Sequence, residues 1–205
     1  MDKFRYVITI QRQFGSMGRP IAKAMAEKLD IEFYDRDLVD QAAQKLNLPV
    51  SRVQETEETG KKTSRNPFWQ MLIPMGSESP DEQDRIFEAQ KNIIRFLAEK
   101  ESCIIVGRAS DFVLQDMENA LHIYIYAPFE DRVRNSVEQL GLSEQEARRM
   151  CADVDKARDE YQLRYAGCRL DDKRTKDILI NSSLFGVDGT ADFLVEAVKR
   201  RFGLS

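Results

Sequence analysis

The sequence predicts a doubly wound α/β domain, in which helices cover both faces of a parallel β-sheet. Short β-branched and aromatic runs alternate with amphipathic helical patterns along the chain. The first run is followed by a glycine-containing loop and a helical pattern, which is the order of a βα unit. The 205 residues suffice for one substantial core, so we expect a single domain over residues 1–205.

The N-terminal stretch has the strongest local pattern. Tyr6–Ile10 is typical of a strand buried on both faces and ends at Gln11, after which a loop contains Gly15 and Gly18. A helix then begins, with Pro20 suited to its first turn. A strand, a loop and a helix in this order bring backbone N–H groups and a helix N-terminus to one point, which attracts phosphate.

This loop departs from the phosphate-loop pattern G-x-x-x-x-G-K-[ST]. Gly18 fits the second glycine, whereas Gln13 replaces the first, Arg19 the lysine, and Pro20 the Ser or Thr. Arg19 would add a forked cationic donor that can bind two phosphate oxygens. Pro20 offers neither a hydroxyl for Mg²⁺ nor a backbone N–H. An ordinary βα turn is the alternative interpretation of the loop.

A second strand is predicted over Ile31–Asp37, and it ends in a D-x-D pattern. Asp35 and Asp37 then lie at the carboxyl end of a strand, where open α/β sheets bind their ligands. One carboxylate could hold a substrate hydroxyl, a base or a hydrated Mg²⁺. Alternatively, Asp37 caps the helix predicted over residues 38–46.

Residues 49–80 are the least regular part of the chain. A polar stretch, Glu55–Arg65, precedes an apolar stretch that prolines interrupt, Asn66–Met75. The apolar stretch could form a surface insertion that covers the core or contacts a homodimer partner.

The remaining elements follow from periodicity and from helix caps, which include the S-P-D-E pattern at Ser79–Glu82 and a capping box of Ser143 with Glu146. We expect helices over residues 79–100, from Pro128 onward, 144–165 and 187–202, and strands over 102–107, 120–127 and 177–181. His122 is expected to be a packed strand residue without a catalytic role. The charged helix over 144–165 could be a solvated helix with i, i+4 ion pairs.

Arg108 follows the strand-ending Gly107, so it is expected to project into the crevice at the carboxyl edge of the sheet. There it could bind the phosphate of an acceptor with two hydrogen bonds. The alternative is a pair with a nearby carboxylate such as Asp111.

Composition excludes several classes of function. A net charge of −4 and a pI near 5.3 argue against a dedicated nucleic-acid binder. No apolar run approaches the ~20 residues that a membrane span requires. Three widely spaced cysteines and a single histidine argue against a zinc site. We therefore expect a reduced cytoplasmic protein.

Taken together, four stretches resemble the cytidylate-kinase-like family of P-loop proteins, which are relatives of the nucleoside monophosphate kinases. In the family's order, they are Ile8–Ala22, Phe33–Leu38, Ile104–Asp111 and Asp155–Tyr161. The resemblance implies a three-layer α/β/α P-loop NTPase fold with a five-stranded parallel sheet, an acceptor-side excursion at 48–80 and a helical lid at 144–176. It also implies ATP, Mg²⁺ and a small-molecule nucleotide acceptor, with CMP or dCMP as the first expectation.

The resemblance further implies roles for individual residues. The expected ligands of the donor phosphates are Gly15, Ser16, Met17, Gly18 and Arg19. The expected substrate-binding residues are Asp35, Arg36, Arg108, Asp111 and Arg164. The expected catalytic cations are Arg19, Lys156 and Arg158, the last two reaching the transferring phosphoryl group from the lid.

Two other functions stay open at this point. The unusual Pro20 and the apolar stretch 67–75 would also suit a nucleotide-sensing or scaffolding protein without turnover. The D-x-D pattern at Asp35 and Asp37 would suit a kinase of a small molecule that is not a nucleotide.

Overall fold

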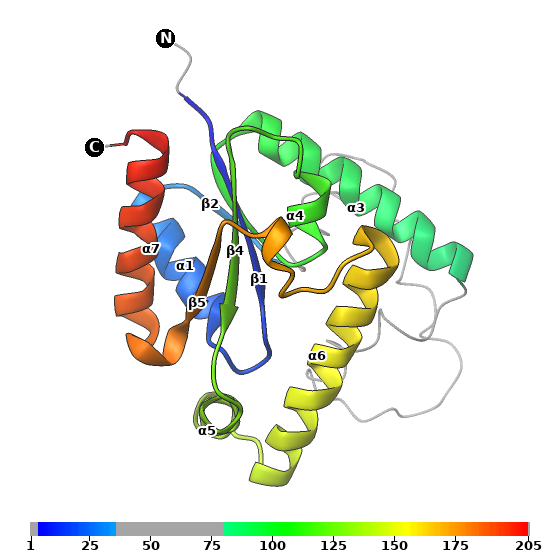
Figure 1. The fold of residues 1–205 in the computed structure, drawn as a ribbon, viewed down its shortest axis with the longest axis vertical. Helices are drawn as coiled ribbons and strands as arrows, with labels where there is room; N and C mark the ends of the chain where they lie inside the picture. Colours follow the sequence, from blue (N-terminus) through cyan, green and yellow to red (C-terminus); the bar gives the residue numbers. More distant parts are fainter. Residues whose placement is uncertain (1–3, 36–79, 205) are drawn as a thin grey trace, which may run out of the picture.

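The computed structural model describes residues 4–35 and 80–204 (Figure 1). Five parallel strands form one sheet in the order β2-β3-β1-β4-β5. Their bounds are β1 (Val7–Arg12), β2 (Glu32–Tyr34), β3 (Cys103–Val106), β4 (Ala120–Tyr126) and β5 (Ile178–Asn181). The predicted α/β class with a five-stranded parallel sheet is confirmed.

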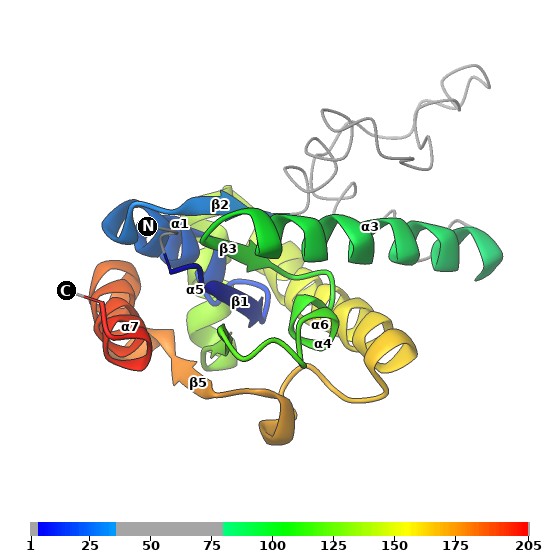
Figure 2. The same ribbon diagram turned by 90° about the horizontal axis from the view of Figure 1, so that it is seen from above.

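Helices cover both faces of this sheet (Figures 1 and 2). α1 and α7 pack on one face, α3 and α4 pack on the other, and α5 and α6 pack against each other. The helices are α1 (Gly18–Leu29), α3 (Pro80–Lys100), α4 (Ser110–Val113), α5 (Phe129–Leu140), α6 (Glu144–Ala166) and α7 (Gly186–Phe202). Two 3₁₀ turns flank β5, namely η3 (Lys173–Thr175) and η4 (Ser182–Leu184).

The two faces of the sheet have separate apolar cores, because side chains alternate along each strand. Ile8 and Ile10 of β1 lie in the core with Met25 of α1, whereas Val7 lies in the opposite core with Ile94 of α3. All five side chains are fully buried. The position of β1 in the middle of the sheet follows from this burial on both faces.

A third apolar cluster lies beside the loop that follows β1. Phe14 packs there against Val133 of α5 and against Met150 and Val154 of α6. α6 begins with the predicted capping box, in which Ser143 and Glu146 bond each other's backbone N–H groups. This packing places the middle of α6 next to the loop.

The first strand is longer than the sequence predicted. It continues past Gln11 to Arg12, because both residues pair with β4, opposite Tyr124 and Ile125. The predicted helix 38–46, the residues Arg36 and Asp37, and the excursion from residue 48 to residue 79 lie outside the described residues.

Candidate active site

Close packing fixes the loop between β1 and α1. Gly15 has a φ of +74°, and a Cβ there would lie 2.5 Å from the carbonyl oxygen of Arg132. A Cβ on Gly18 would lie 2.7 Å from the Cβ of Arg12. Ser16 is fully buried, and its hydroxyl donates to two backbone carbonyl oxygens. Both glycines are therefore required by the path of the loop.

The backbone N–H groups of the loop divide into two sets. Those of Gln13 and Phe14 donate to the carbonyl oxygen of Ile125 at 3.1 Å and to the carboxylate of Asp155 at 2.7 Å. Those of residues 15–19 donate to no acceptor in the described part of the chain. These five consecutive donors lie at the N-terminus of α1, where the helix dipole is positive. Such an arrangement binds anions.

Side chains from α5 and α6 hold the loop from outside. The guanidinium of Arg132 donates to the carbonyl oxygen of Phe14 at 3.2 Å and pairs with Asp155. Asn135 donates to the carbonyl oxygen of Gly15 at 2.9 Å. Burial raises the pKa of Asp155, although the N–H of Phe14 and the guanidinium of Arg132 oppose this rise. No role for Arg132 or Asn135 was predicted, because these side chains contact residues that are 118 and 120 positions away in the chain.

Four arginines surround this loop, namely Arg12, Arg19, Arg108 and Arg158. Arg19 pairs with Asp35 at 2.5 Å, and its side chain is 59% exposed. Arg158 of α6 donates to the carbonyl oxygen of Arg12 at 3.1 Å. Arg108, at the end of β3, has a φ of +61°, and its buried Nε has no acceptor within the described residues.

The positive charges of these arginines repel one another, and burial together with this repulsion lowers the pKa values of two of them. Burial lowers the pKa of Arg158 to about 10, and Arg108 contributes to the fall while Asp155 opposes it. Burial also lowers the pKa of Arg12, and the charges of Arg158 and Arg108 lower it further. The site therefore holds positive charge that an anionic ligand would stabilise.

Two other cations that were predicted to bind substrate or phosphate, Lys156 and Arg164, contact carboxylates away from the loop. Lys156 is 77% exposed, and its nearest carboxylate is that of Glu160 at 3.8 Å. Arg164 donates to Asp84 of α3 at 2.7 Å. Of the expected lid residues, the structure places Arg158 against the loop, whereas Lys156 and Arg164 lie in other surroundings.

Asp111 lies in a buried polar network rather than in the crevice. Its carboxylate accepts hydrogen bonds from Gln11 at 2.8 Å, from Gln162 at 3.0 Å and from the Nζ of Lys176 at 2.6 Å. Asp111 and Lys176 are almost completely buried. The ion-pair partner of Asp111 is thus Lys176 and not Arg108.

Replacing Asp111 with alanine is expected to lower the free energy of unfolding by about 3–5 kcal/mol, because the ammonium of Lys176 stays buried without its partner. Urea denaturation measures this loss. The double variant Asp111→Ala, Lys176→Met should recover most of it, since no buried charge remains. A double variant that is as unstable as the single one would refute a stabilising role for the pair.

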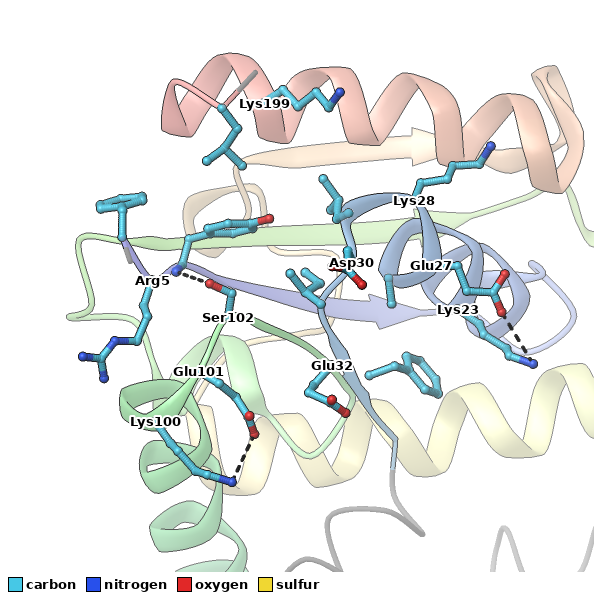
Figure 3. Close-up of a pocket in the computed structure, with 17 residues that line it drawn as sticks. Arg5, Lys23, Glu27, Lys28, Asp30, Glu32, Lys100, Glu101, Ser102 and Lys199 are labelled. Atoms are coloured by element: carbon cyan, nitrogen blue, oxygen red, sulfur yellow. Dashed lines mark hydrogen bonds and ion pairs between the residues drawn. The ribbon is translucent and has the colours of Figure 1, made fainter. Parts of the chain in front are cut away.

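A hollow of about 900 Å³ lies at the amino edge of the sheet, opposite to the edge that carries the loop (Figure 3). Residues before β1 and β3, the start of β2, and the ends of α1 and α7 line it. Two of its lysines pair locally, Lys23 with Glu27 at 3.8 Å and Lys100 with Glu101 at 3.6 Å. This hollow is separate from the loop and its arginines.

The strand order, together with a glycine-containing loop between β1 and α1, defines the fold of a P-loop kinase. The chain belongs to the Cytidylate kinase-like family, whose sequence model matches residues 7–184. Family and fold imply nucleotide binding and indicate a phosphotransferase of small molecules. In the described residues, no helix has the length and apolar character to cross a membrane.

Solved structures share the fold. An uncharacterized protein from Eubacterium ventriosum ATCC 27560 has a TM-score of 0.72 at 27% identity, over 95% of this chain and 99% of that one. Shikimate kinase from Bacteroides thetaiotaomicron has a TM-score of 0.52 at 13% identity, over 97% and 99%. Shikimate kinase from Acinetobacter baumannii, in complex with shikimate, has 0.50 at 14%, over 96% and 92%. The search of curated proteins found no match.

Proposed function

We propose that this protein transfers the γ-phosphoryl group of ATP to a nucleoside monophosphate, with CMP or dCMP as the first candidate acceptor. The observation that carries the proposal is the run of backbone N–H groups at residues 15–19, which have no protein acceptor among the described residues. The surrounding arginines add a positive charge that suits the phosphates of both substrates.

Each group has a separate role in this proposal. The N–H groups of residues 15–19 hold the donor phosphates, and Arg108, whose buried Nε has no acceptor among the described residues, binds the phosphate of the acceptor. Arg158 stabilises the charge on the transferring group. Such a reaction needs alignment of two phosphates and electrostatic stabilisation, and little covalent chemistry from the protein. In related enzymes one arginine of this kind contributes roughly 10³–10⁵ to the rate.

Mg²⁺ would reach the site with ATP. In residues 4–35 and 80–204, no group of three or more His, Cys, Asp or Glu side chains could hold a metal ion. Asp35 directly follows β2, and its ion pair with Arg19 places its carboxylate beside the loop. It is therefore the protein group that we assign to a hydrated ion. The ion would neutralise part of the phosphate charge.

Two alternatives share the same phosphate site. A sensor or scaffold would bind ATP without turnover, which Pro20 motivates because it removes the hydroxyl of the usual loop. A kinase of a small molecule that is not a nucleotide is the other, since two of the similar structures are shikimate kinases.

A coupled assay of ADP release separates these functions. We expect turnover with CMP or dCMP in a panel of nucleoside monophosphates, and none with shikimate. Without an acceptor, ADP release should fall to the hydrolytic background. ATP binding with no turnover on any acceptor would favour the sensor, and turnover on a hydroxylated acid alone would favour the third function.

A further inference from the structure

Arg12, the last residue of β1, was not a candidate from the sequence. Its charge interacts nonetheless with four of the charged side chains around the loop. Three are cations, Arg19, Arg108 and Arg158, and one is the carboxylate of Asp35. The side chain therefore lies within the site, although its Cα belongs to the sheet.

Two glycines make room for this side chain. The Cβ of Arg12 lies 2.7 Å, and its Cγ 2.9 Å, from the point where Gly18 would carry a Cβ, so the aliphatic stem runs over the first turn of α1. One terminal nitrogen, Nη1, lies 2.5 Å from the point where Gly107 would carry a Cβ. Arg12 thus spans the space between the start of α1 and the end of β3. A larger residue at either glycine would displace it.

Among the residues that the structure describes, the guanidinium of Arg12 has no hydrogen-bonded or ion-paired partner. Within the described ranges, no ion pair or hydrogen bond joins its nitrogen atoms to an acceptor. Arg19, which stands at the lysine position of the phosphate-loop pattern, is instead paired with Asp35 and largely exposed. Arg12 is therefore a cation against the loop with no ion pair among the described residues, and it reaches the first turn of α1 from the end of β1.

We propose that Arg12 binds the phosphates of the nucleotide donor, in the role that the lysine of a regular phosphate loop fills, and that Gly18 and Gly107 are needed to seat it. This inference rests on the proposed function only in its choice of ligand. A planar guanidinium can bind two phosphate oxygens at once, which an ammonium cannot do.

The test uses Arg12→Met, which keeps most of the stem and removes the charge. Without ligand, this variant should melt at the same temperature as the wild type or higher, because a buried cation among other cations is gone. The increase in Tm that sodium tripolyphosphate or a non-hydrolysable ATP analogue causes should be largely lost. Titration calorimetry should show the affinity for either probe weakened by about tenfold or more.

Two further variants complete the test. Arg12→Lys keeps a charge without the fork, so it should bind both probes with an affinity between those of the wild type and Arg12→Met. If Arg12→Met does not fold, the comparison of Arg12→Lys with the wild type still shows whether Arg12 binds the phosphates. Arg95→Met, on an exposed position of α3, is the matched control and should bind like the wild type.

The outcomes separate this inference from the proposed function. If the wild type binds the probes and both Arg12 variants bind them equally well, the inference is overturned and the proposed function stands. If all variants bind as predicted but no acceptor supports turnover, Arg12 is a phosphate ligand of a sensor. A wild type that binds neither probe would refute both.

Discussion

Arg108→Ala is expected to raise the KM for the acceptor nucleotide by about 10–100-fold while the protein stays folded. The loss corresponds to one or two charge-assisted hydrogen bonds to a phosphate. The fold should survive because, in the described residues, the side chain of Arg108 makes no hydrogen bond or ion pair and its Nε is buried without an acceptor. Steady-state kinetics with varied CMP, alongside a melting curve, measure both effects.

The KM for ATP is the internal control for this variant, and it should change much less than that for CMP. Arg95→Ala, on the exposed face of α3, should leave both constants unchanged. An Arg108→Ala enzyme whose acceptor KM equals that of the wild type would remove Arg108 from the acceptor site.

Gly15→Ala is expected to abolish nucleotide binding and to lower the free energy of unfolding by about 2–4 kcal/mol. The added Cβ would lie 2.5 Å from the carbonyl oxygen of Arg132, which is backbone and cannot move alone. The φ of +74° adds the strain of a left-handed conformation. Urea denaturation and calorimetry with an ATP analogue measure the two losses.

Gly141→Ala separates the effect of backbone strain at positive φ from the effect of a steric clash. Gly141 ends α5 with a φ of +66°, yet no atom lies within 4 Å of the Cβ that alanine would add. This variant should lose about 1 kcal/mol and bind nucleotide normally. If both variants lost the same stability and both retained binding, the close packing of the loop would have no functional importance.

Local patterns in the sequence were sufficient to predict most of the fold. β-Branched runs marked the strands, and the capping box at Ser143 and the S-P-D-E pattern at residue 79 marked two helix starts that agree with α6 and α3. These signals work because they depend on neighbouring residues. The role of Asp155 could not be found in this way, since it bonds a backbone N–H 141 positions away.

The site was harder to predict than the fold. An arginine at the end of a strand resembles a solvated residue, and only the spatial approach of Gly18 and Gly107 shows that Arg12 lies within the site. Arg19 occupies the lysine position in the pattern, but a carboxylate from the next strand, that of Asp35, pairs with it. Contacts between distant segments decided both cases.

Amide signals of protein labelled with ¹⁵N-glycine test the central claim most directly, because they report on the loop itself. On titration with a non-hydrolysable ATP analogue, the signals of Gly15 and Gly18 should shift strongly, whereas those of Gly141 and Gly203, at the ends of α5 and α7, should stay in place. The spectrum of Gly15→Ala would assign the first of them. Saturating binding with no shift at either loop glycine would contradict the claim that these N–H groups hold phosphate.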